Sequence, residues 1–168
     1  MEFHVGDKVV YPAQGLGIIR DVVTEDIEGD KATIYVLKIL DNGMTIRVPV
    51  RNARAIGMRS VISREHVEKV YDILRDRDVP TDNHTLNRRY RDYTSKIKTG
   101  DPLEVAKVLR DLALLKSEKA LSFGERKMFD HARSLLVQEI AVAKDCDERI
   151  VGDEIDTLFK ALATKAAS

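Results

Sequence analysis

The chain has 168 residues, 43% hydrophobic and 33% charged, which suffices for one or two compact domains and excludes disorder throughout. Its 28 basic and 28 acidic residues cancel to a formal net charge of zero, so any nucleic-acid contact must be local rather than a nonspecific coat. We expect a cytosolic protein with no membrane contact, because there is no run of about 18 apolar residues and no signal sequence. Its one cysteine excludes an internal disulfide.

Short strands separated by glycine turns are predicted from residue 1 to about residue 57. The clearest strands are 8–11, 17–20 running into 22–23, 34–40 and 44–50. Asp41-Asn-Gly43, between the last two, is a strong hairpin signal. A five-strand, glycine-punctuated unit of this size is typical of a small SH3-like or Tudor-like β-barrel, so we assign 1–57 to such a domain.

The segment 44–50 predicts a strand with two different faces. Alternation gives one face to Met44, Ile46, Val48 and Val50 and the other to Thr45, Arg47 and Pro49. Because Pro49 cannot donate a backbone hydrogen bond, the strand fits best at the edge of its sheet.

The hydrophobic period becomes helical from about residue 63. Five helices are predicted. The first begins at Ser63 and fades at 76–80, the second covers about 86–98, and the third begins at the Asp101-Pro102 cap. The fourth runs from the Ser122 capping box to about Lys144, and the fifth covers about 148–164. The polar segment 79–85 is predicted as a loop. We assign residues 58–168 to a compact all-α domain of about five helices.

Catalytic chemistry has no candidate residues in this sequence. The four histidines lack metal-ligand spacing, there is no phosphate loop, and Gly15-Leu-Gly17 is more simply a turn between strands. The carboxylates Glu125, Asp130 and Glu139 are interpreted as capping and solvated helix residues. We therefore expect neither enzyme activity nor a cofactor or metal.

Positive charge is concentrated on the second predicted helix, where five basic residues against one acidic residue between Arg88 and Lys98 give +4. At about 100° per residue, Leu86, Tyr90, Tyr93 and Ile97 form one stripe. We predict that the last three serve the core. Leu86, at the helix start, either joins them or is exposed, where it would wedge at a minor-groove base step.

Basic residues beside Leu86 fit contacts with phosphates. Arg88 and Arg89 would hold phosphates on either side of such a wedge. The Arg126-Lys127 pair, near the start of the fourth helix, would add a further phosphate contact.

Six ordered blocks across both domains resemble the CarD/CdnL family of bacterial transcription regulators. The blocks are Val5-Gly-Asp-Lys-Val-Val-Tyr-Pro12 with Gln14-Gly15, Tyr35-Val-Leu-Lys38, Arg47-Val-Pro49, Asn87-Arg-Arg-Tyr90, Val108-Leu-Arg-Asp-Leu112 and Leu121-Ser-Phe-Gly-Glu-Arg-Lys-Met128. The N-terminal part is also similar to the RNA polymerase interaction domain of transcription-repair coupling factors.

The resemblance implies a Tudor-like domain that binds the RNA polymerase β subunit and a helical domain that contacts promoter DNA upstream of the −10 element, stabilising the open complex. It implies polymerase contacts at Arg47 and Pro49, with Thr45 and Val36 beside them. It implies DNA contacts at Arg88, Arg89 and Arg91, with help from Arg126 and Lys127. Leu86 stands where the family has a wedge tryptophan, and this chain has no tryptophan.

Such a protein would be a monomer that associates with the bacterial nucleoid through polymerase and contacts DNA only when docked. The alternative from another class is a protein–protein adaptor with no role at DNA. Charge reversal at the three arginines of the second helix would disable the regulator and spare the adaptor.

Overall fold

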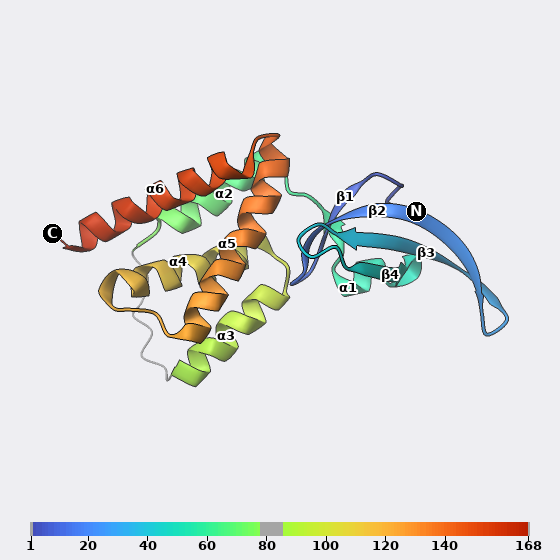
Figure 1. Ribbon diagram of the computed structural model, residues 1–168, viewed down its shortest axis with the longest axis horizontal. Coiled ribbons are helices and arrows are strands. Elements are labelled where there is room, and N and C mark those ends of the chain that lie inside the picture. Colours follow the sequence, from blue (N-terminus) through green and yellow to red (C-terminus); the bar gives the residue numbers. More distant parts are fainter. Residues whose placement is uncertain (1, 78–85, 168) are drawn as a thin grey trace. The chain divides into compact units, whose positions relative to one another are not determined.

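The computed structural model describes residues 2–77 and 86–167 and divides the chain into two compact units, Met1–Val61 and Ile62–Ser168. The first unit is a β-sheet and the second is helical (Figure 1). The division falls after Val61 rather than after residue 57, because a short strand, β5 (Arg59–Ser60), pairs with β1 (Lys8–Tyr11).

The first unit is a five-stranded antiparallel sheet and not the closed barrel that we predicted. Its order is β4-β3-β2-β1-β5. The strands between the two edges are β3 (Asp30–Ile39), β2 (Gly15–Ile27) and β1, and the edges are β4 (Thr45–Pro49) and β5. Among the described residues no ladder joins β4 to β5. The chain between them forms a 3-10 turn, Val50–Asn52, and a short helix, α1 (Ala53–Ile56), and the two residues of β5 pair only with β1.

The predicted hairpin between β3 and β4 is confirmed. The Ile39 N–H donates to the Met44 carbonyl over 2.8 Å, and Gly43 has the positive φ of 71° that the turn requires. Position 49 also lies on an edge strand, as its missing donor predicts.

The hairpin formed by β2 and β3 is longer than predicted. Beyond the bulge between Ile19 and Asp21, the two strands continue to pair as far as Ile27 and Asp30 (Figure 1). The turn consists of Glu28 and Gly29, at φ of 51° and 86°. Around the turn, from Thr24 to Thr33, the residues are mostly polar, so the sequence has no apolar alternation there to reveal the strands.

Inward side chains of the sheet build a small core. Tyr35 and Leu37 are buried along β3, and the Phe3 ring meets the Tyr35 ring edge-on at 5.7 Å between centroids. In β4, Val48 is buried while Thr45 and Arg47 are exposed, which confirms the predicted alternation. The outer face of β4 is therefore available to a partner.

Five helices of the second unit follow the predicted boundaries closely. They are α2 (Arg64–Arg75), α3 (Leu86–Lys98), α4 (Pro102–Glu118), α5 (Phe123–Lys144) and α6 (Glu148–Ala167). The caps are those that the sequence predicts: Asp101 Oδ1 accepts from the Leu103 N–H at 2.9 Å, and Ser122 and Glu125 form a reciprocal capping box. The predicted loop 79–85 lies outside the described residues.

Apolar stripes from all five helices meet in one core. Its fully buried members include Val70, Leu74, Leu109, Leu112, Leu136, Ile140, Val151 and Ile155. The prediction of a solvated Glu139 is wrong: the side chain is buried and accepts from the Ile62 N–H at 3.0 Å. A backbone donor in a partly buried position needs such an acceptor.

A polar contact joins three helices of this unit. The Tyr71 hydroxyl of α2 donates to Glu154 of α6 over 2.6 Å, and the Lys144 ammonium of α5 donates to the same carboxylate at 3.1 Å. The hydrogen bond from Tyr71 lowers the pKa of Glu154, and the contact with Lys144 lowers it further. Burial, followed by the bond to Glu154, raises the pKa of Tyr71. The contact is therefore strongest where Glu154 is ionised and Tyr71 is protonated.

Candidate functional site

Two surfaces hold the residues that the sequence selected, one on each unit. The first, the edge surface, consists of Val36, Thr45, Arg47 and Pro49. Val36 of β3 lies directly opposite Arg47 of β4 in the ladder. The neighbouring pairs are Lys38 with Thr45 and Ile34 with Pro49. All of these residues share the face opposite to the core residues Tyr35 and Leu37.

Arg47 is not alone on this surface, because it forms an ion pair with Glu25 of β2. The pair spans the sheet from β4 to β2, on either side of β3. Its members remain 50% and 45% exposed. This partner was not predictable, since Glu25 lies in the part of β2 that alternation failed to predict.

The three arginines of α3 do not lie on one face. The buried side chains Tyr93 and Ile97 define the inward stripe. By helix geometry Arg89 borders this stripe on one side, while Arg88 and Arg91 point away from it. Burial agrees, because Arg89 is partly buried and the other two are exposed. A single DNA segment can thus meet Arg91 without meeting Arg89.

The prediction that Tyr90 serves the core is wrong. Its side chain is 47% exposed, and one edge of its ring lies against Gly124 in the first turn of α5. A Cβ at Gly124 would lie 3.4 Å from Tyr90 Cε2, an ordinary van der Waals contact, so the ring lies close to the helix start. Tyr90 therefore connects the arginine helix to the second predicted basic segment, Arg126-Lys127.

The second surface, the aromatic–basic surface, consists of Tyr90, Arg91, Phe123, Arg126 and Lys127. Phe123 is the first residue of α5 and is 74% exposed. The Lys127 ammonium lies over its ring, 4.7 Å from the centroid. Such a contact between a cation and an aromatic face leaves the other face of the ring open to solvent.

Phe123 was missed by sequence reasoning. The capping box marks Ser122 as the N-cap and therefore places Phe123 at the first helical position, at the very end of the helix. That position was the available signal. Leu86, the predicted wedge, begins α3, but its side chain lies outside what the structure describes.

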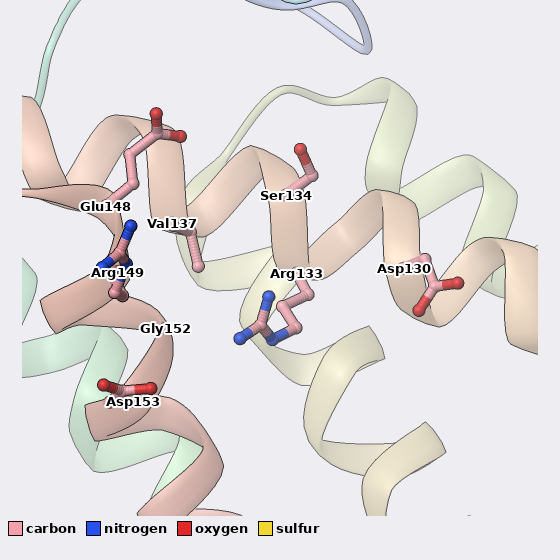
Figure 2. A pocket seen from close by; sticks show the side chains of 8 residues that line it. All are labelled: Asp130, Arg133, Ser134, Val137, Glu148, Arg149, Gly152 and Asp153. Carbon is pink, nitrogen blue, oxygen red and sulfur yellow. The ribbon is translucent and has the colours of Figure 1, made fainter.

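Apart from these two surfaces, the helical unit has an open groove of about 490 Å³ between α5 and α6 (Figure 2). Its charged lining comprises Asp130, Arg133, Glu148, Arg149 and Asp153. Arg133 reaches across the α6 backbone to Asp156, bonding both carboxylate oxygens at 3.1 and 3.2 Å. Acidic and basic side chains mix along both walls, so the groove favours neither anions nor cations.

Within the described ranges, no group of three or more metal-binding side chains gathers in one place. None of the helices there has the length and apolarity needed to cross a membrane.

Comparison with known proteins gives matches over both units. Residues 3–62 match the model of the CarD-like/TRCF RID domain, and residues 69–156 match the model of the CarD C-terminal domain. YdeB of Bacillus subtilis (strain 168), which its name proposes to be a transcription factor, is 34% identical over 151 residues, or 88% of this chain and 95% of YdeB.

Two solved structures from Myxococcus xanthus are also similar to part of the chain. CdnLNt is 39% identical over 38% of this chain and 90% of its own, with a TM-score of 0.33. The 72-residue N-terminal domain of CarD is 33% identical over 34% of this chain and 77% of its own, with a TM-score of 0.31.

Proposed function

Since this chain belongs to the CarD family, we propose that it is a transcription regulator that binds RNA polymerase through its sheet and promoter DNA through its helical unit. Its partner on polymerase is the β subunit, and its effect is to stabilise the open promoter complex from upstream of the −10 element. It acts in the bacterial cytoplasm as a monomer, at the nucleoid through polymerase.

The edge surface supports the first half of this proposal. An edge strand presents unpaired backbone groups with which a partner strand can pair, and β4 is such a strand. Arg47 offers a planar, bidentate cation beside it, suited to a carboxylate of the partner. Thr45, Pro49 and Val36 complete a small, mixed polar and apolar contact.

The aromatic–basic surface supports the second half, and the exposure of Phe123 carries it. Phe123 and the half-exposed Tyr90, which lies against the neighbouring Gly124, form an exposed aromatic patch beside Arg126 and Lys127, and such a patch supports a binding role. Phenylalanine is one of the side chains that insert between base steps in the minor groove, and neighbouring cations hold the phosphates. We propose that Phe123 supplies the aromatic wedge that position 86 lacks.

The net charge of zero explains why two surfaces are needed. A protein with so small a basic patch binds free DNA weakly. Docking on polymerase raises the effective concentration of the helical unit at upstream DNA. Contacts that exist only with melted or distorted DNA then shift the population toward the open complex without any chemical step.

Two binding measurements test this proposal together: binding of the protein to RNA polymerase and binding of the protein to promoter DNA alone. The full-length protein should bind purified RNA polymerase, lose that binding on Arg47→Ala, and bind naked promoter DNA negligibly. Tight, sequence-specific binding to naked DNA would overturn the tethered mechanism. If the protein binds polymerase but substitution of Arg91 or Phe123 leaves the open-complex lifetime unchanged, an adaptor is favoured instead.

A further inference from the structure

The ion pair between Glu25 and Arg47 crosses the outer face of the sheet diagonally. In the ladder Arg47 stands in the row of Val36 and Asp21, whereas Glu25 stands in the row of Ala32. The row of Val23, Ile34 and Pro49 lies between them. To reach Glu25, the Arg47 side chain must therefore lie flat over Ile34 rather than extend from the edge of β4.

Burial at Ile34 agrees with this path. Ile34 alternates with the core residue Tyr35 and so belongs to the outer face, yet it is only 4% exposed. The aliphatic stem of an arginine can cover apolar surface while its guanidinium stays in water. Glu25 thus holds Arg47 in a conformation that points away from the edge of β4.

A pair of this kind is easily exchanged. Both side chains are about half exposed, and exposed ion pairs contribute little to folding. A partner carboxylate that approaches the edge of β4 competes directly with Glu25 for the same guanidinium, and Glu25 repels it. The same carboxylate gains more from an arginine that is already released.

We infer that Glu25 restrains Arg47 in the unbound protein and that docking exchanges Glu25 for an acidic group of the partner. This inference rests on the proposed polymerase contact and adds to it a residue that weakens and tunes the affinity. It also assigns the chemistry of the partner surface: a carboxylate beside the strand that meets β4.

Affinity for RNA polymerase tests the exchange. Glu25→Gln should tighten binding of the full-length chain by about two- to fivefold, since an exposed ion pair no longer competes. Asp26→Asn is the matched control, because it removes the same charge from the next residue of β2, on the opposite face. In an Arg47→Ala background, Glu25→Gln should have no larger effect than the control.

A second measurement needs no polymerase. Nitrogen NMR of the free protein can measure the rate of rotation about the Arg47 guanidinium bond. This rate should increase in Glu25→Gln and stay unchanged in Asp26→Asn. Unchanged rotation in Glu25→Gln, or polymerase binding that weakens or stays equal, would overturn the restraint while leaving the proposed function intact. Absence of polymerase binding by the unmodified chain would overturn both.

Discussion

Truncation of Phe123 to alanine separates folding from function, because the ring is 74% exposed. Its removal leaves no cavity and costs the fold mainly the contact with Lys127, about 0.5–1 kcal/mol at an exposed site. A base stacked on an aromatic ring is worth about 1–3 kcal/mol. At about 1.4 kcal/mol per factor of ten, the variant should shorten the lifetime of the open promoter complex by about 5- to 150-fold.

The assay follows decay of polymerase–promoter complexes after a competitor is added, beside urea unfolding of each variant. Ile150→Ala is the matched control, since Ile150 is a 51% exposed apolar residue elsewhere on the helical unit. It should leave the lifetime unchanged, and Phe123→Trp should preserve or lengthen it. An unchanged lifetime for Phe123→Ala in a protein that still binds polymerase would refute the wedge.

The remaining predictions concern charge, pH and packing. Arg91→Glu should shorten the open-complex lifetime about five- to tenfold and Arg89→Glu far less, because the buried stripe separates Arg89 from the aromatic–basic surface. Tyr71→Phe removes the hydrogen bond to Glu154 and should cost about 1 kcal/mol in urea unfolding at pH 7. That difference should shrink as the pH falls below about 4, because a lowered Glu154 pKa stabilises the fold only while the carboxylate is ionised. Gly17→Ala should lower the unfolding free energy by about 1–3 kcal/mol, since its Cβ would lie 2.6 Å from a leucine methyl of β3.

Hydrophobic periodicity and helix-capping residues predicted most of the fold. The helix starts at Ser63, Asp101 and Ser122 were predictable because a capping side chain acts on backbone groups two or three residues away. The hairpin at Asp41-Asn-Gly43 was predictable for the same local reason. The failure to close a barrel was not, because it depends on whether two strands distant in sequence pair with each other.

The candidate site was predictable only in part. Alternation identified the exposed face of β4, including Arg47, but it cannot reveal an ion pair to a residue twenty-two positions away. Helix periodicity predicted burial of Tyr93 and Ile97 correctly and of Tyr90 wrongly, because the stripe ends where α3 passes the first turn of α5. Phe123 became a candidate only once its exposure was known.

The decay rate of the open promoter complex, measured with and without this protein, tests directly whether docking on polymerase lets the helical unit act at promoter DNA. Decay should be slower with the unmodified chain and not slowed with Arg47→Ala, because an undocked helical unit holds DNA too weakly. Slowing that persists in Arg47→Ala, or a decay rate unchanged by the unmodified chain at saturating concentration, would contradict this mechanism.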